Sequence, residues 1–227
     1  MNILKKTLLG VAAVLLSAGV SLAQAQVSVT EVAPWSSGNS PVGADWFELT
    51  NTGTSALNIT GWKMDDNSAS FTRSVALAGL SSIAAGQSVI FVEGDASTAS
   101  TFISTWFGTS VPAGLLVGYY SGNGVGLSTS GDAINIYSVS GVLQASVSFG
   151  ASDASAPYQT FDNAAGLNNT SISQLSVVGV NGAFVASGSV SEIGSPGSIA
   201  AVPEPETYAM LLAGLGLVGA MARKRRV

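Results

Sequence analysis

The middle of this 227-residue chain is divided into short segments rich in valine, isoleucine and aromatic residues, each ended by turn-forming residues. In one of them Trp46, Glu48 and Thr50 alternate with Phe47 and Leu49, the period of two that puts neighbouring side chains on opposite faces of a strand. The segments predicted as strands are 27–32, 45–50, 57–64, 88–92, 115–119, 133–137, 142–149, 172–178 and 184–187, with 188–202 as a final strand leading into a linker. Short strands separated by turns favour an all-β sandwich.

One segment has helical spacing instead. Apolar residues between 98 and 107 recur at intervals of three and four, which predicts a short helix with Asp95 or Ser97 as its N-cap. These apolar residues are Phe102, Ile103, Trp106 and Phe107. The predicted fold is therefore all-β with one short helix.

Charge is distributed unevenly along the chain. Residues 27–202 contain two cations, Lys63 and Arg73, against eleven carboxylates, a formal charge of −9. Nucleic-acid binding is excluded, because it requires a basic face. The sequence has no cysteine and no histidine, which excludes disulfides, thiolate nucleophiles, Cys or His zinc sites and catalytic triads with an imidazole base.

Residues 1–25 are predicted to be a signal peptide. Two lysines precede an apolar run over residues 7–20, and Ala23 and Ala25 provide the small residues that signal peptidase requires. Cleavage is expected after Ala25, with Ala23 as the alternative site. An uncleaved membrane helix is the competing interpretation, but the apolar run is shorter than the ~20 residues that a membrane span needs.

The other end of the chain also has the pattern of a membrane segment. Residues 208–222 carry no charge and are predicted to form a short transmembrane helix, with residues 223–227 as a basic cytoplasmic tail. A helix of this length rises about 22 Å, so flanking residues must extend the span. The basic residues are Arg223, Lys224, Arg225 and Arg226. This orientation places the acidic body in the periplasm.

Residues 199–207 are predicted to be a linker that contains Pro203, Glu204 and Pro205. This motif, followed by a short apolar helix and a terminal basic cluster, resembles the PEP-CTERM sorting signal of Gram-negative bacteria. The resemblance implies that an exosortase, a membrane-embedded cysteine transpeptidase, cuts near the motif and releases or re-attaches the body at the cell surface or in the extracellular matrix. It also implies an association with exopolysaccharide or biofilm matrix. An unprocessed C-terminal anchor is the alternative.

Several motifs of the body resemble a lamin tail domain. They are Val29-Thr30-Glu31-Val32, the run from Asp45 to Asn51, the run from Gly61 to Asp66, and Ser130-Gly131-Asp132 before the 133–137 strand. The resemblance covers residues 27–198, although the part beyond residue 151 matches poorly. It implies an immunoglobulin-like β-sandwich that acts as an interaction module and not as an enzyme. Because the chain also carries the sorting signal, the partners expected for this module are exopolysaccharide or other matrix proteins.

Two glutamates are candidates for paired catalytic carboxylates. Alternation places Glu31 on one face of its strand with Val27 and Val29, and Glu48 belongs to a neighbouring predicted strand. Glycoside hydrolysis needs such a pair at a defined separation. The competing interpretation is that each glutamate accepts hydrogen bonds from backbone amides or from Trp62, and we favour it because of the family resemblance.

A secreted hydrolase that uses carboxylates alone is the alternative function. Its candidate residues are Glu31, Glu48, Asp65, Asp66 and Asp132. Asp65 and Asp66 also begin an oxygen-rich turn that could bind calcium, although a solvated turn is the simpler interpretation. No cofactor other than calcium is expected.

Aromatic residues provide a candidate sugar-binding surface. Tyr119 and Tyr120, together with Trp35, could stack on sugar rings, or they could be ordinary core residues, which we favour. The glycine-rich segment 118–126, which includes the two tyrosines, lacks the lysine and the strand-to-helix context of a phosphate loop, and it is predicted to be a flexible loop.

Overall fold

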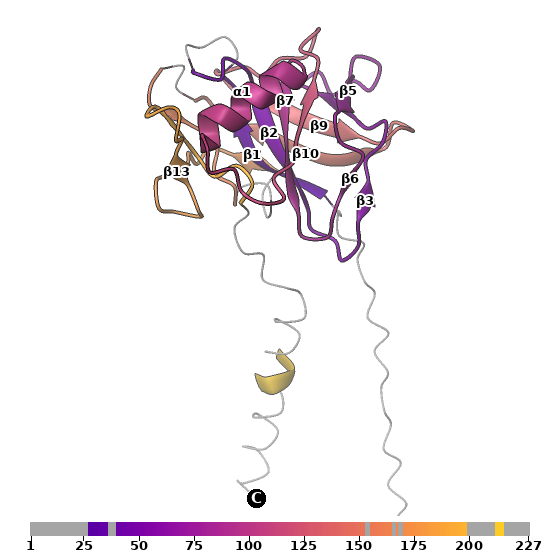
Figure 1. Cartoon of the computed structure of the whole chain (residues 1–227). Helices are drawn as coiled ribbons and strands as arrows, with labels where there is room; N and C mark the ends of the chain where they lie inside the picture. Colours follow the sequence, from indigo (N-terminus) through magenta and orange to yellow (C-terminus); the bar gives the residue numbers. More distant parts are fainter. Residues whose placement is uncertain are drawn as a thin grey trace, which may run out of the picture.

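The computed structural model describes residues 27–35, 40–152, 155–164, 167, 170–198 and 212–215. The described body is mostly β-structure with a short helix, α1 (Ala96–Phe107), which is consistent with an immunoglobulin-like sandwich (Figure 1). Residues 212–215 form a further short helical segment. The predicted signal peptide and most of the predicted transmembrane helix lie outside the described residues. Within the described part of the chain, no helix has the length and hydrophobicity required to cross a membrane.

A nine-stranded sheet forms the framework of the body. In spatial order its strands are β1 (Val27–Ala33), β2 (Trp46–Asn51), β7 (Ser88–Glu93), β8 (Val117–Tyr120), β5 (Val75–Ala78), β4 (Lys63–Asp65), β9 (Asp132–Tyr137), β10 (Leu143–Phe149) and β12 (Ser171–Ile172). Neighbouring strands are antiparallel except for the parallel pairs β7–β8 and β10–β12. The sheet folds back on itself so that β1 packs against β10. It therefore has two halves that face each other across one core, with β5 joining them.

The inner core lies between the two halves of the sheet. Phe47 and Phe91 stack in the first half with ring centroids 5.8 Å apart, and Phe149 contacts Phe161 at 5.2 Å in the second. Other buried members include Leu49, Trp62, Met64, Val89, Ile134, Ile136 and Val147. These residues alternate with outward-facing ones along each strand, so the predicted alternation in 45–50 and 133–149 is confirmed.

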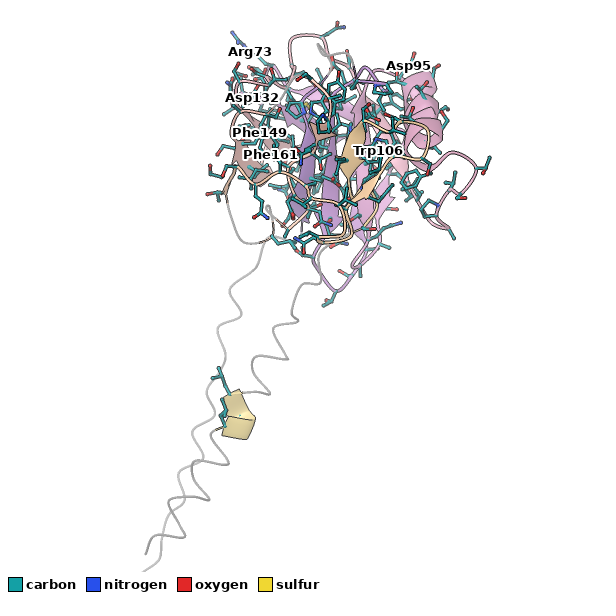
Figure 2. All side chains as sticks on the ribbon, turned by 90° about the vertical axis from the view of Figure 1, so that its left-hand side faces the viewer. Arg73, Asp95, Trp106, Asp132, Phe149 and Phe161 are labelled. Carbon is teal, nitrogen blue, oxygen red and sulfur yellow. The ribbon has the colours of Figure 1, made fainter. Side chains whose placement is uncertain are left out.

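A second hydrophobic cluster covers the opposite face of β2 and β7. Trp46 lies 5.2 Å from Phe102 and 5.5 Å from Trp106 of α1, both in edge-to-face geometry. Ile90 and Val92 belong to the same cluster. In Figure 2, Trp106 lies on the α1 side of the body, away from Phe149 and Phe161 of the inner core. The central strands are therefore buried on both faces.

Helix α1 begins at Ala96 because Asp95 caps it. The Asp95 side chain accepts hydrogen bonds from the backbone N–H groups of Ser97 and Thr98, and the Thr98 hydroxyl faces the backbone N–H of Asp95. This capping box satisfies N–H groups that have no partner within the helix. The predicted helix and its Asp95 cap are confirmed, and the helix begins two residues before the predicted 98.

Residues beyond 151 complete the outer side of the body. A small sheet has the order β11 (Tyr158–Gln159), β14 (Glu192–Gly194) and β13 (Phe184–Val185). Earlier in the chain, β3 (Leu57–Asn58) and β6 (Ser82–Ile83) form a separate two-stranded sheet. Phe184 of β13 packs on Trp106 at 5.7 Å. The C-terminal part of the body thus shares the outer hydrophobic cluster with α1.

Three strand predictions need correction. The predicted strand 57–64 is split into β3 and β4, because the chain turns at Gly61, whose φ of +74° suits glycine. Of the predicted strand 172–178, the structure retains the pairing of Ser171–Ile172 with β10 and an isolated antiparallel bridge between Leu175 and Phe161. The register of β1 shifts between Val29 and Glu31, a β-bulge that moves Glu31 away from the face of Val27 and Val29.

Removing buried atoms from either half of the inner core should destabilise the fold. Leu49→Ala and Ile136→Ala each remove a side chain that is 0% exposed, and each is expected to lower the free energy of unfolding by about 2–5 kcal/mol. Urea unfolding of the purified protein followed by tryptophan fluorescence measures this loss. Val190→Ala, at a position that is 94% exposed, is the matched control and should change it by less than about 0.5 kcal/mol.

Candidate functional site

Two buried glutamates face each other across β1 and β2. Glu31 and Glu48 are direct Cα partners in the antiparallel ladder, and both side chains are 0% exposed. Glu48 shares its face of β2 with Trp46, and the bulge in β1 brings Glu31 to that same outer face. The expectation that these glutamates lie on neighbouring strands is confirmed.

The two carboxylates accept hydrogen bonds from the C-terminal segment of the body. The backbone N–H of Ser195 donates to Glu31 Oε1 at 2.7 Å, and the backbone N–H of Gly197 donates to Glu48 Oε2 at 2.7 Å. Gly194 allows this close approach, because a Cβ there would lie 2.6 Å from Glu31 Oε1. A segment that follows Glu48 by almost 150 residues therefore closes over the pair.

Hydroxyl groups provide the remaining hydrogen bonds. Thr160 Oγ1 donates to Glu31 Oε1 at 2.6 Å, and Thr30 Oγ1 donates to Glu48 Oε1 at 2.6 Å. A chain of hydroxyls continues from Thr30 to Thr50 at 2.9 Å and from Thr50 to Ser88 at 2.7 Å. Trp62, considered above as a donor, lies in the inner core instead.

Burial makes both glutamates hold protons more tightly than usual. Burial raises the pKa of Glu31 well above its ordinary value, and the charge of Glu48 raises it further. Burial also raises the pKa of Glu48 to about 7, although its hydrogen bonds to Thr30 and Gly197 partly oppose the rise. The pair therefore retains protons into the neutral pH range.

Glu192 is a third buried carboxylate, in β14. Its Oε1 accepts a long hydrogen bond of 3.5 Å from the backbone N–H of Val42, and burial raises its pKa to about 7. The residue is 0% exposed. The sequence analysis did not select Glu192, because its surroundings come from residues about 150 positions earlier.

The other candidate carboxylates lie where turns meet β4 and β9 in the second half of the sheet, since Asp65 ends β4 and Asp132 begins β9. Asp65 Oδ2 accepts hydrogen bonds from Ser68 Oγ at 2.8 Å and from the backbone N–H of Ser70 at 2.6 Å. Asp132 Oδ1 accepts from the backbone N–H of Asn67 at 3.0 Å, which ties the two turns together. Each carboxylate thus stabilises a turn, away from Glu31 and Glu48.

Asp66 holds its own turn in the same way. Its Oδ1 accepts from the backbone N–H of Ser68 at 2.8 Å, and its main-chain oxygen accepts from Asn135 Nδ2 at 2.7 Å. Among the residues that the structure describes, no group of three or more His, Cys, Asp or Glu side chains could hold a metal ion. Calcium binding by Asp65 and Asp66 remains a proposal.

The hypothesis of an aromatic sugar-binding surface is wrong for two of its three residues, because their side chains are buried. Trp35 and Tyr120 are both 0% exposed, and Trp35 packs on Tyr158 with ring centroids 5.7 Å apart. Tyr119 is half-buried beside Gly79. The core interpretation holds for Trp35 and Tyr120.

The residues of the two predicted processing signals are not placed by the structure. Those for signal cleavage and sorting, Ala23, Ala25, Pro203, Glu204, Pro205, Arg223, Lys224, Arg225 and Arg226, lie outside the described residues. The last described residue of the body is Ser198. The sorting motif therefore begins five positions after the end of the described body.

Comparison with known families agrees with the sequence resemblances. The Lamin Tail Domain family matches residues 21–151, more than half of the chain, and the chain belongs to that family. The PEP-CTERM protein-sorting motif matches residues 201–226, which marks an exported protein that an exosortase processes. No curated protein matches the chain. Both predicted resemblances are confirmed, and the family match ends before the segment after β14 that supplies Ser195 and Gly197.

The raised pKa values predict that stability falls as pH increases. Between pH 4.5 and about 7 the unfolded chain has lost the Glu48 proton while the folded protein still holds it, so unfolding releases a proton. Each such proton lowers the free energy of unfolding by about 1.4 kcal/mol per pH unit. Urea unfolding measured from pH 5 to pH 8 should therefore show a steady loss of stability, with Glu31 extending it upward.

Glu48→Gln should make this pH dependence shallower, because the amide does not titrate. Asp66→Asn, in an exposed turn of the other half of the sheet, is the control and should leave the slope unchanged. A stability that is constant or rises over this range would show that the buried pair carries charge when folded.

Proposed function

We propose that this protein is an exported, exosortase-processed surface or extracellular-matrix module without catalytic activity. The PEP-CTERM match at residues 201–226 is the observation that carries the proposal. Membership of the lamin tail family favours an interaction role over catalysis. The signal-peptide pattern of residues 1–25 agrees with export.

The proposed route has two cleavages. Signal peptidase removes residues 1–25, and the apolar run 208–222 holds the chain in the inner membrane with the basic tail 223–227 in the cytoplasm. The body then lies in the periplasm until exosortase cuts near Pro203-Glu204-Pro205. Release or re-attachment brings the body to the cell surface or the extracellular matrix.

The surroundings of the candidate carboxylates support a non-catalytic role. A substrate could reach Glu31 and Glu48 only by displacing residues 195–197, which hydrogen-bond to them. A general acid and base must instead lie within hydrogen-bond reach of substrate. Asp65 and Asp132 are occupied in holding turns.

The proposed partners are exopolysaccharide or other matrix proteins. The exposed side chains of the outer face of β10 and of α1 are largely hydroxyl-bearing. They include Ser97, Ser100, Thr101, Ser104, Ser146 and Ser148. Such surfaces can hydrogen-bond to sugar hydroxyls, whereas the body's charge of −9 disfavours strongly anionic polymers.

The two proposed cleavages should leave a mature chain of defined mass. We expect the exported protein to begin near Gln24 or Gln26 and to lack Arg223–Arg226, which intact-mass spectrometry of the secreted and surface fractions measures. Replacing Pro203, Glu204 and Pro205 by alanine should leave the C-terminal segment attached and the chain in the membrane fraction. The matched control is alanine at Thr207, next to the motif, which should be processed normally. An intact C-terminus in the released protein would contradict the proposal.

The absence of catalysis is tested with substrate pools. The purified protein should give no turnover above buffer with polysaccharide, peptide or phosphoester substrates. Turnover that disappears in a folded Glu31→Gln, Glu48→Gln or Asp132→Asn variant would instead establish the hydrolase alternative. Circular dichroism distinguishes a folded inactive variant from an unfolded one.

A further inference from the structure

A small open pocket lies beside β12, the last strand of the second half of the sheet. Its volume is about 280 Å³, and it is enclosed by residues 162–164, residues 171–174 and Asn181. We call it the Asp162 pocket. Its polar lining residues are Asp162, Ser171, Ser173, Gln174 and Asn181. All of them follow residue 151, so the pocket lies outside the part of the chain that matches the lamin tail family.

Alternation along two extended segments explains why polar groups face this pocket. Ile172 of β12 belongs to the inner core, so Ser171 and Ser173 on either side of it face away from that core. Phe161 also belongs to the inner core (Figure 2), and the next residue, Asp162, faces the opposite way. The two segments thus bury their apolar side chains and turn polar ones toward the pocket.

Hydrogen bonds fix the Asp162 carboxylate in place. Its Oδ1 accepts from the backbone N–H of Ala164 at 2.8 Å and from Asn181 Nδ2 at 3.0 Å. Its Oδ2 accepts from the same Nδ2 at 3.1 Å, and the residue is only 3% exposed. A carboxylate has about four acceptor positions, so these three contacts leave Oδ2 able to accept one more hydrogen bond.

A tight turn presents Asn181 to this carboxylate. The backbone N–H of Ala183 donates to the main-chain oxygen of Val180 at 2.8 Å, and the two residues between them, Asn181 and Gly182, have φ of +47° and +82°. Asn-Gly is a pair that tolerates positive φ at both positions. Asn163 Nδ2 donates to the main-chain oxygen of Asn181 at 2.8 Å and anchors the turn. The polar groups of the pocket are therefore preorganised for a ligand, which reduces the entropic cost of binding.

We propose that the Asp162 pocket binds one neutral sugar residue, at the end or on a side branch of a polysaccharide. Sugar hydroxyls donate and accept hydrogen bonds, and the pocket offers a carboxylate that accepts together with hydroxyl and amide groups that do both. Its volume lies just below the ~300–1,000 Å³ of sites for drug-sized ligands, which suits a single ring. The choice of a saccharide rests on the proposed function, and the pocket names the part of the body that recognises it.

Other classes of ligand fit the pocket less well. Its described lining contains a single carboxylate, and no group of three acidic, His or Cys side chains in the described chain could hold a metal ion. A uronate or a phosphate would face Asp162, and no lysine or arginine is among the described lining residues. An apolar ligand would bury the polar groups without hydrogen-bond partners. A neutral ring rich in hydroxyls avoids all three costs.

Saturation-transfer NMR titration of the full chain tests the site, in a detergent without a sugar head group. The probes are glucose, galactose and mannose, together with the three corresponding uronates. At least one neutral sugar should bind with a dissociation constant in the millimolar range, because a ligand with so few atoms makes few contacts. Its uronate should bind at least about tenfold more weakly, because two like charges are then placed together.

Two variants test the pocket while keeping Asp162, which also holds the backbone of Ala164. Gln174→Ala removes an exposed amide that can donate and accept. Asn181→Gly retains a residue suited to positive φ and removes the amide that orients the carboxylate. Each variant should weaken binding of that sugar by about threefold or more, because hydrogen bonds at the site are lost.

Each variant has a matched control outside the pocket. Gln144→Ala is the same change on β10, and Asn123→Gly is the same change at another asparagine that precedes a glycine. Both controls should bind the sugar normally, and circular dichroism should show that all four variants are folded. The controls therefore separate a local effect on the pocket from a general effect on the protein.

Three results would overturn the site. They are the failure of every neutral sugar to bind, equal or tighter binding of the uronates, and an affinity that is unchanged in both Gln174→Ala and Asn181→Gly. None of them bears on cleavage near residues 203–205, which the mass of the exported protein measures independently. Failure of this site is therefore distinguishable from failure of the proposed function.

Discussion

The burial of β2 on both faces is the constraint on which the rest of the fold depends. All six residues of the strand are buried, but their two faces differ chemically. Phe47 and Leu49 present an apolar face, which ends at the hydrogen-bonded Asn51 and which the second half of the sheet covers. The other face is apolar at Trp46 and polar at Glu48 and Thr50, so no single apolar element could cover it. Helix α1 packs on the apolar end, and hydroxyl and amide groups from residues 160–197 cover the polar end.

Because its polar end needs hydrogen-bond donors, the outer face of β2 binds the C-terminal segment of the body. The family match ends at residue 151, whereas Glu31 and Glu48 find their partners at Thr160, Ser195 and Gly197. Until those residues are in place, two buried carboxylates would lack main-chain donors, at a cost typical of unsatisfied buried groups. These contacts are therefore complete only a few residues before the sorting motif, so the proposed cleavage there would keep every one of them within the mature protein.

Local patterns predicted the parts of the fold that local interactions determine. The alternation of Trp46 to Thr50 and the capped helix at Asp95 needed only neighbouring residues, and both are confirmed. The bulge that redirects Glu31 has no local signature, because it is defined by pairing with β2. Strand β5 was missed because Val-Ala-Leu-Ala has no polar alternation, and its place between the two halves depends on the partners β4 and β8.

The same distinction applies to the candidate site. The adjacency of Glu31 and Glu48 followed from neighbouring strands, but the donors Thr160, Ser195 and Gly197 lie more than 120 positions away in the chain. The sequence favoured core positions for Tyr119 and Tyr120 over a sugar-stacking pair but did not separate the two residues, whereas alternation along β8 turns Tyr120 inward and leaves Tyr119 half-buried. Contacts between residues so distant in sequence are set by the assembled sheet and cannot be read from spacing.

An acidic domain whose residues 27–202 contain two cations has few cations with which to pair its buried carboxylates. Glu31, Glu48 and Glu192 are stabilised instead by holding protons and accepting hydrogen bonds, which works best in mildly acidic surroundings. This arrangement makes folding stability depend on pH. Because the folded body holds these protons at pH values where the unfolded chain has lost them, it gains stability as the pH falls through the raised pKa values of the three glutamates.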